Sequence, residues 1–232
     1  MRHSIPLTAG GPLDPFGTLR NALWIGGGQW AGKSTVARLL ASRYGLTTYH
    51  YDVHDAHAHQ DRRIAQRARD GLPTTDPDPD DVWVHPTPEA MAAATLAGFP
   101  MRFGWALDDL RALVSGRPLI AEGWGLRPEL VHPLLTNLRR MIVMVPTAAF
   151  REQQVRDLPR AAALGITVSD PTRAQANRIA RDVLVAEDAV RSALRLGIQV
   201  INVDGSLDAE AVASQVAEHF QPFLPPLEVP GD

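Results

Sequence analysis

The sequence has no cysteine and only one lysine. Without cysteine the chain cannot form a disulfide, a thiolate zinc site or a cysteine nucleophile. No apolar run approaches the roughly 20 residues that a membrane-spanning helix needs. The N-terminus also lacks the charged and then apolar pattern of a signal peptide. We therefore expect a cytoplasmic protein that has no membrane partner.

Charge of either sign is also modest. The 232 residues are 45% hydrophobic and 21% charged, with a formal net charge of −3, which is ordinary for a globular protein. No basic face suggests a nucleic-acid partner. The length suits a single domain. We place that domain at residues 21–221, after an irregular N-terminal arm at 1–20 and before a proline-rich tail at 222–232.

A glycine-rich stretch follows the first apolar run. The eight residues from Gly27 to Ser34 read G-G-Q-W-A-G-K-S and match the phosphate-binding pattern G-x-x-x-x-G-K-S. Lys33 is the only lysine among 23 basic residues. A compact ammonium on a flexible stem suits the β- and γ-phosphates better than a forked guanidinium does. The alternative is a chance glycine-rich turn.

This loop predicts two kinds of contact with a nucleotide. Backbone N–H groups would cradle the phosphates, Lys33 would act in catalysis, and the Ser34 hydroxyl would ligate Mg²⁺. The predicted nucleotide-binding residues of the loop are Gly27, Gly28, Gln29, Trp30, Ala31, Gly32, Lys33, Ser34 and Thr35.

Strand-like and helical segments alternate along the chain. Strands are predicted at 22–25, 47–51, 118–121, 141–145 and 198–203. The main helices are predicted at 33–43, 53–69, 87–97, 101–114 and 172–196. This alternation predicts an α/β fold with a five-stranded parallel doubly wound sheet and helices on both faces. Residues 53–115 form a helical insertion, to which we assign substrate binding.

Two acids follow predicted strands. Asp52 and Glu122 end strands that we expect to flank the phosphate loop, where open α/β sheets bind ligands. We assign Asp52 as the base that orients the acceptor, and Glu122 to the Mg²⁺ shell through water. Asp55 is the rival base and a candidate substrate ligand. The alternative for each acid is a solvated cap on the following helix.

Arginines gather on both sides of a break that contains Gly165 and Pro171. We predict that region 150–181 is a closing lid and that Arg151, Arg156, Arg178 and Arg181 stabilise charge on the transferred phosphoryl group. In a chain this rich in arginine, a solvated helix face is the alternative for each of them.

Rings and charges concentrate in the insertion. Trp83, Arg102 and Trp105, together with Trp124, predict a wall that binds a sugar or base ring. His85 and Phe103 could belong to the same wall, and the alternative for all of these rings is the core. A metal site at His54, His57 and His59 has little support, because residues i and i+2 point to different faces of a helix.

These features resemble the P-loop kinases built on the nucleoside-monophosphate-kinase fold. That group includes shikimate and gluconate kinases, chloramphenicol phosphotransferase and zeta-toxin-type kinases. The resemblance covers the element order over residues 22–220. In that group an Asp at the end of strand two acts on the acceptor, and Tyr51-Asp52 occupies this place. The resemblance implies ATP and Mg²⁺ as cofactors and a small-molecule hydroxyl as the acceptor.

Two further stretches carry the resemblance. Residues 122–127 read E-G-W-G-L-R and are similar to a D/E-G-x-x-x-R signature, which implies that Arg127 helps to hold the substrate. The turn of Asp204, Gly205 and Ser206 resembles a loop that packs against adenine. The chain departs from the group at Trp30, where small residues are usual, and it has no signature that reads a particular substrate.

The sequence thus favours an ATP-dependent phosphotransferase that acts on a metabolite, nucleoside, sugar or antibiotic. A regulatory protein that binds a nucleotide without transferring phosphate is the alternative. A nucleic-acid motor is disfavoured, because the chain has no basic stripe and no hydrophobic run that ends in adjacent acids.

Overall fold

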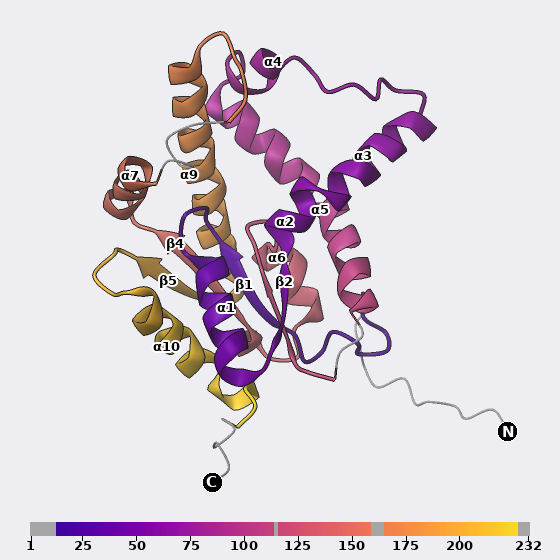
Figure 1. The fold of residues 1–232 in the computed structure, drawn as a ribbon. Coiled ribbons are helices and arrows are strands. Elements are labelled where there is room, and N and C mark those ends of the chain that lie inside the picture. Colours follow the sequence, from indigo (N-terminus) through magenta and orange to yellow (C-terminus); the bar gives the residue numbers. More distant parts are fainter. Residues whose placement is uncertain (1–12, 114–115, 159–164, 227–232) are drawn as a thin grey trace, which may run out of the picture.

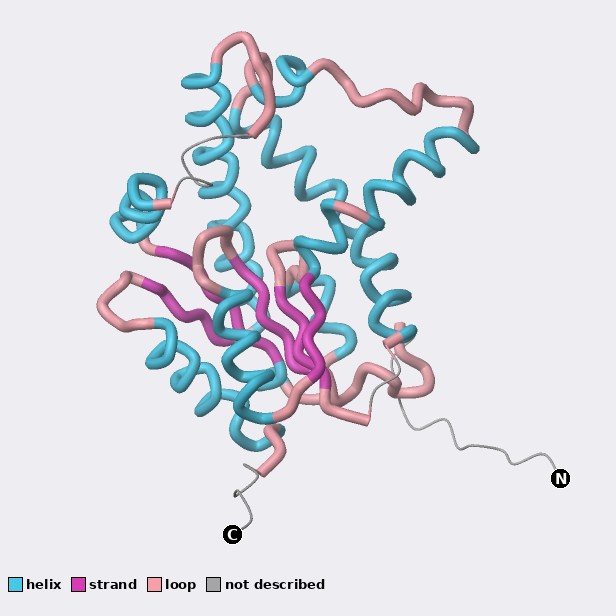
Figure 2. The backbone as a smooth tube through the Cα atoms, in the orientation of Figure 1, coloured by secondary structure: helices cyan, strands magenta, loops and turns pink. Residues whose placement is uncertain are grey.

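Five parallel strands form one sheet at the centre of the protein (Figures 1 and 2). The computed structural model describes residues 13–113, 116–158 and 165–226. The strands are β1 (Leu23–Gly27), β2 (Thr47–His50), β3 (Leu119–Glu122), β4 (Met141–Pro146) and β5 (Gln199–Val203). Their order is β2-β3-β1-β4-β5, and every pair is parallel. The predicted fold class is confirmed.

Successive side chains of a strand point to opposite faces of the sheet. Both faces of this sheet are apolar, and helices therefore cover both. Leu23 and Ile25 of β1 pack with α1 (Lys33–Tyr44) and α10 (Ala209–Phe220). Trp24 points to the opposite face. There the core includes side chains from α5 (Pro88–Ala112) and α9 (Pro171–Leu196).

The insertion between β2 and β3 is helical, as predicted, but its helices differ from the prediction. Its elements are α2 (Tyr51–Ala56), α3 (Ala58–Arg69), α4 (Pro79–Trp83) and α5. The segment 53–69 is not one helix, because the backbone breaks at His57, with φ −119° and ψ −88°. In Figure 1, α3 projects from the body, and an exposed loop joins it to α4.

The two helices predicted at 87–97 and 101–114 are one continuous helix, α5. Pro100 lies inside it. Proline lacks the N–H that would bond the carbonyl four residues earlier, and this usually breaks a helix. Here the guanidinium of Arg102 donates to the carbonyls of Thr95 and Gly98 at 3.0 and 3.1 Å. These bonds connect Arg102, after the proline, to the helical turn before it, and the helix continues.

Shorter elements complete the chain. They are α6 (Pro128–Val131), η1 (His132–Leu134), η2 (Leu138–Arg140), α7 (Ala148–Asp157) and η3 (Gln221–Phe223). Most of the predicted arm and tail, residues 1–12 and 227–232, lies outside the described residues, as do positions 159–164 of the predicted lid. Within the described ranges, no helix combines the length and apolar character needed to cross a bilayer.

Candidate functional site

The phosphate loop joins β1 to α1 at the centre of the sheet edge. Gly27 has φ +119°, and a Cβ there would lie 2.1 Å from the carbonyl oxygen of Met144. Only glycine lets the chain pass so close to β4. Lys33, the first residue of α1, is 5% exposed, and its Nζ donates to the carbonyl of Gly28 at 2.6 Å. The ammonium is therefore held over the loop.

Trp30 lies at the tip of this loop in a left-handed conformation. Its φ of 66° is the only positive φ at a non-glycine position among the described residues. For a bulky residue this conformation stores strain, of the kind that gathers at functional sites. Trp30 is therefore unusual both in its large side chain, where related loops have small residues, and in its backbone conformation.

Asp52 comes from the first turn of α2, which starts directly after β2. Its Oδ1 accepts a hydrogen bond from the backbone N–H of Trp124 at 3.1 Å. Burial raises the pKa of Asp52 from 3.8 to about 6, while the nearby Lys33 ammonium lowers it and Glu122 raises it. A carboxylate with this pKa is mostly ionised at neutral pH and can accept a proton there more readily than an ordinary Asp, as a general base must.

Glu122 ends β3 and is 1% exposed. Its Oε1 lies 2.8 Å from Nδ1 of His50, and this hydrogen bond is the main cause of a raised His50 pKa. In the part of the chain that the structure describes, Oε2 of Glu122 is buried without a hydrogen-bond partner. One oxygen is therefore left to bind something else.

One sequence expectation about these acids is wrong. The strand order places β3 and β4 beside β1, so β2 does not flank the phosphate loop. Asp52 lies in the first turn of α2, directly after β2, where the Lys33 ammonium and the Glu122 carboxylate both act on its charge. Its role as the base stays a prediction.

Tyr51 fixes the backbone beside Asp52. Its ring is fully buried, and a Cβ on Gly125 would lie 2.1 Å from it. Gly123 likewise leaves room for the Cβ of Tyr51, which an added Cβ would approach to 2.6 Å. The glycines on either side of Trp124 therefore allow the loop after β3 to wrap Tyr51, and the backbone of this loop holds Asp52.

Three of the four predicted lid arginines act on one acid, Asp182 of α9. Arg181 contacts its Oδ1 through Nε at 3.0 Å and Nη2 at 2.7 Å. Burial raises the pKa of Asp182, while Arg181, Arg178 and Arg151 lower it. Arg156 is exposed on α7 and is not among these groups.

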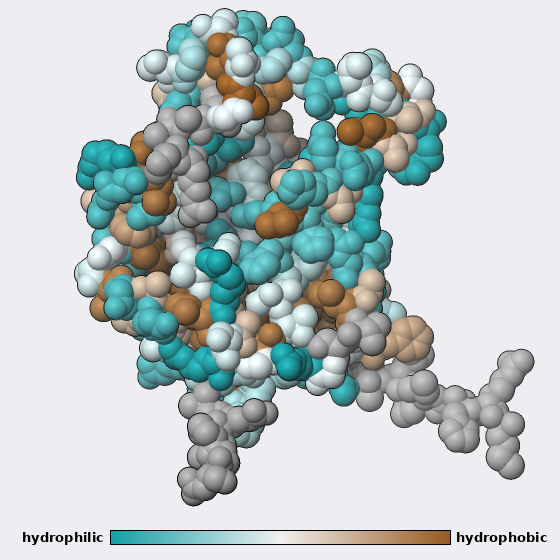
Figure 3. Space-filling view, in the orientation of Figure 1, coloured by the Kyte–Doolittle hydropathy of each residue, from teal (hydrophilic) through white to brown (hydrophobic). Residues whose placement is uncertain are grey.

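Part of the predicted aromatic wall is present. The Cζ atom of Arg181 lies 5.1 Å from the ring centre of Trp83 and 5.3 Å from that of Trp124. Arg181 and Arg102 also line a cavity of about 440 Å³ together with Arg63 and residues of α4 and α5. Figure 3 shows this face to be largely hydrophilic, with a recess below the loop between α3 and α4.

Other members of the predicted wall lie elsewhere. Phe103 is 4% exposed and packs against Trp24 in the core. Trp105 lies beside His59 and lines a separate cavity with residues 13–18, so it does not face the phosphate loop side of α5. His85 is exposed and pairs with Asp81. Phe103 is therefore a core residue, as the alternative had it. His85 lies at the surface, and Trp105 belongs to a different cavity.

Arg127 is also placed differently from its prediction as a substrate ligand. It has no exposed surface. Its guanidinium donates to the carbonyl of Val185 at 3.0 Å and contacts the carboxylates of Glu129 and Asp188. The residue ties α6 to α9, because a buried guanidinium must satisfy its donors within the protein.

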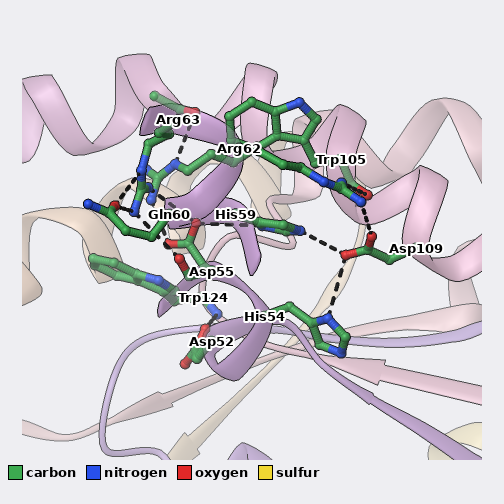
Figure 4. A network of polar contacts seen from close by, with 12 residues as sticks. Asp52, His54, Asp55, His59, Gln60, Arg62, Arg63, Trp105, Asp109 and Trp124 are labelled. Atoms are coloured by element: carbon green, nitrogen blue, oxygen red, sulfur yellow. Dashed lines mark hydrogen bonds and ion pairs between the residues drawn. The ribbon is translucent and has the colours of Figure 1, made fainter. Parts of the chain in front are cut away.

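Asp55 belongs to a polar network between α2, α3 and α5 (Figure 4). Its Oδ2 accepts from Arg102 at 2.8 Å, and it also pairs with Arg63. His59 is fully buried between Asp55 and Asp109, with its Nε2 2.8 Å from Asp109. With its oxygens engaged here, Asp55 is a weaker candidate than Asp52 for the base. Among the described residues, no group of three or more His, Cys, Asp or Glu could hold a metal ion.

The turn that resembles an adenine loop follows β5. Asp204 accepts from the backbone N–H and hydroxyl of Ser206 at 2.9 and 2.6 Å. Gly205, with φ +83°, lies against the ring of Phe150 from α7. This turn is therefore in contact with α7, which lies in the predicted lid region.

Sequence reasoning missed Asp182 and the pairing of His59 with Asp109. Asp182 lies within an amphipathic helix, next to arginines that could equally be solvated. Its inward position, four residues before buried Ala186, is the one signal that could have identified it. The pairing of His59 with Asp109 joins residues 50 apart and has no local signal.

The strand order, the loop after β1 and the lysine at the start of α1 define a parallel α/β protein with a phosphate-binding loop. No protein-family model matches the chain, and no curated protein matches its sequence. Among solved structures it is similar to a shikimate kinase from Aquifex aeolicus, with 14% identity and a TM-score of 0.43 over 87% of this chain and 96% of that one. A gluconokinase from Sinorhizobium meliloti has 13% identity and a TM-score of 0.41 over 89% and 94% of the two chains.

Proposed function

We propose that this protein is an ATP-dependent phosphotransferase that moves the γ-phosphate to a hydroxyl of a small molecule. One observation carries the proposal. Asp52, a carboxylate whose pKa burial raises to about 6, lies close enough to the lysine of the phosphate loop for that ammonium to lower its pKa. A protein that only bound a nucleotide would have no need for a carboxylate tuned to exchange a proton at this point.

The site also fits Mg²⁺, which phosphate loops hold together with ATP. The buried Oε2 of Glu122 has no hydrogen-bond partner in the described part of the chain and can accept one from a metal-bound water. Ser34, in the first turn of α1, would supply the hydroxyl ligand. When bound, the ion neutralises phosphate charge.

The transfer needs one proton movement and one bond exchange. The acceptor oxygen forms a bond to the γ-phosphorus, and the bond from that phosphorus to the β–γ bridging oxygen breaks. Asp52 takes the acceptor's proton, and ADP leaves with the electron pair of the broken bond. Lys33 balances the negative charge of the phosphates.

We propose that the acceptor binds between the ring of Trp124 and the cavity of about 440 Å³, because Arg181 both lines this cavity and lies over that ring. Trp124 donates its backbone N–H to Asp52, and its ring faces Arg181. An acceptor stacked on this ring would therefore lie close to the base. The volume suits a metabolite, nucleoside, sugar or antibiotic.

An ADP-release assay over a panel of hydroxylated metabolites, nucleosides, sugars and antibiotics tests the proposal. We expect one class of acceptor to stimulate turnover. Lys33→Ala and Asp52→Asn should each lower that turnover by at least about a hundredfold. Asp52→Asn should still bind ATP, because the loop is intact.

The regulatory alternative predicts a different result. ATP would bind tightly, no acceptor would stimulate ADP release, and Asp52→Asn would behave as the wild type while Lys33→Ala lost nucleotide binding. That pattern would reject phosphoryl transfer and favour a protein that uses the loop as a switch.

A further inference from the structure

Helix α9 touches the phosphate loop. A Cβ on Gly28 would lie 3.0 Å from the Cβ of Ala186, so these two segments are in close contact. Asp182 precedes Ala186 by four residues, which is about one turn, or ~6 Å, along the same helix face. The buried carboxylate of Asp182 is thus close to the loop, on the side where α9 extends beyond the sheet edge (Figure 1).

Guanidinium groups from two helices converge on this carboxylate. Arg181 binds it directly at 2.7 Å, and Arg178 of α9 and Arg151 of α7 both act on its charge. Arginines from both helices of the predicted lid region, α7 and α9, therefore act on a single acid.

One donor near Asp182 is left for an anion. Besides Arg181, both Arg178 and Arg151 act on the charge of Asp182, and Glu187 is a further acid that acts on Arg151. Burial lowers the pKa of both Arg151 and Arg178. The Nε of Arg151 is buried and has no hydrogen-bond partner within the described residues. A buried guanidinium N–H of this kind is suited to an anion.

We propose that Asp182 is a positioning residue for the phosphoryl transfer proposed above, on which this inference rests. It holds Arg151, Arg178 and Arg181 together beside the phosphate loop, so that they meet the charge that develops on the transferred group. Asp182 itself touches neither substrate. It acts by offsetting the repulsion among the arginines before the nucleotide arrives, and it orients Arg181 through two hydrogen bonds.

Asp182→Asn separates this role from a merely structural one. We expect kcat to fall at least about tenfold, because misplaced groups lose transition-state contacts. The KM for ATP should stay the same or fall, because a negative charge beside the triphosphate is removed. Asp182→Glu keeps the charge, so its kcat should lie between the two. If Asp182→Asn does not fold, Asp182→Glu carries the test, and a wild-type kcat in it would overturn the proposal.

Asp14→Asn is the matched control. Asp14 is also 5% exposed, and it accepts two backbone N–H bonds, from Thr18 and Leu19, in the N-terminal segment. Its loss should lower stability but leave kcat and KM unchanged. If both variants change stability and neither changes kcat, Asp182 is only structural and the proposal fails.

Hydrogen exchange gives a readout that does not need an acceptor. With a non-hydrolysable ATP analogue and Mg²⁺, wild-type residues 148–157 and 171–181 should gain protection together with the phosphate loop. In Asp182→Asn, only the loop should gain it. Equal protection of both helices in the variant would overturn this inference alone. A wild-type protein in which neither the loop nor the helices respond would overturn the proposed function, and this inference with it.

Discussion

At the scale of single residues, the ionised carboxylate of Asp52 lowers the stability of the folded protein. Its folded-state pKa of about 6 lies above the ordinary value of 3.8, so the folded protein binds the proton more tightly than the unfolded chain does. The wild type therefore loses stability as the pH rises from about 4 to 6, because the buried carboxylate must ionise.

Asp52→Asn should remove this loss. Asparagine does not titrate, and its carbonyl can still accept the N–H of Trp124. Above pH 6 we expect the free energy of unfolding to rise by about 1–2 kcal/mol, after a discount for partial exposure. Below pH 4 the difference should vanish. Urea unfolding of both proteins at pH 4, 5, 6 and 7 measures this, and two parallel pH curves would contradict it.

Replacing Arg127 should have the opposite effect on stability. Because its buried guanidinium is bonded to Val185, Glu129 and Asp188, Arg127→Met should cost about 2–3 kcal/mol of folding stability. At a temperature where the variant is folded, the KM for the acceptor should stay within about twofold of wild type. Thermal unfolding and steady-state kinetics measure the two effects. A large rise in KM without loss of stability would restore the substrate-binding role that the sequence signature implies.

At the scale of elements, the close packing of the loop after β3 against Tyr51 depends on two glycines, Gly123 and Gly125. Gly125→Ala would press a methyl group into the ring of Tyr51, which is fully buried and has no room to move. We expect a loss of about 1–3 kcal/mol in stability, and lower turnover because Asp52 is adjacent. Chemical denaturation and the ADP-release assay measure both.

Gly104→Ala is the control for that substitution. Gly104 is exposed within α5, and a Cβ there meets nothing within 4 Å. A glycine in a helix interior is unfavourable, so this variant should gain about 0.5–1 kcal/mol and keep wild-type turnover. Equal effects of the two substitutions would show that the contact with Tyr51 does not matter.

The elements show where sequence reasoning works and where it stops. Short apolar runs identify the central strands β1, β3 and β4, because these strands are buried on both faces. The edge strands β2 and β5 are recognised by their β-branched or aromatic residues and by the acid that follows each. The helix break at His57 and the continuity of α5 through Pro100 were not predictable, because contacts made only in the folded state override local preference. Arg102 illustrates this, since it donates to carbonyls beside Pro100 and also pairs with Asp55.

The candidate site divides in the same way. The phosphate loop and the acids after β2 and β3 have local signatures, and the structure brings Lys33, Asp52 and Glu122 together. Trp105, matched only by residue type, and Arg127, matched by a short signature, lie elsewhere, because neither composition nor a short motif specifies which way a side chain points. Asp182 shows the converse, since only packing reveals its partners.

At the scale of the whole molecule, nucleotide binding should stabilise the fold. A ligand that binds only the folded state at a hundred times its Kd adds about 2.7 kcal/mol. For a chain of this size, that corresponds to a rise in Tm of roughly 5–10 °C. Thermal unfolding with ATP and Mg²⁺ measures it. Lys33→Ala should lose most of the rise, and an equal rise in that variant would place the nucleotide elsewhere.

Because the chain has a single lysine, chemical modification of that residue can report on the phosphate loop. Lys33 supplies the only side-chain amine of the chain, and it is buried against the carbonyl of Gly28. An amine-acylating reagent can therefore modify one side chain at most, and only when the loop releases its ammonium. The mass gain at Lys33, followed over time, would count loop opening events, and a bound nucleotide should slow it. Peptide mapping separates this signal from acylation of the α-amino group, the other amine that such a reagent modifies.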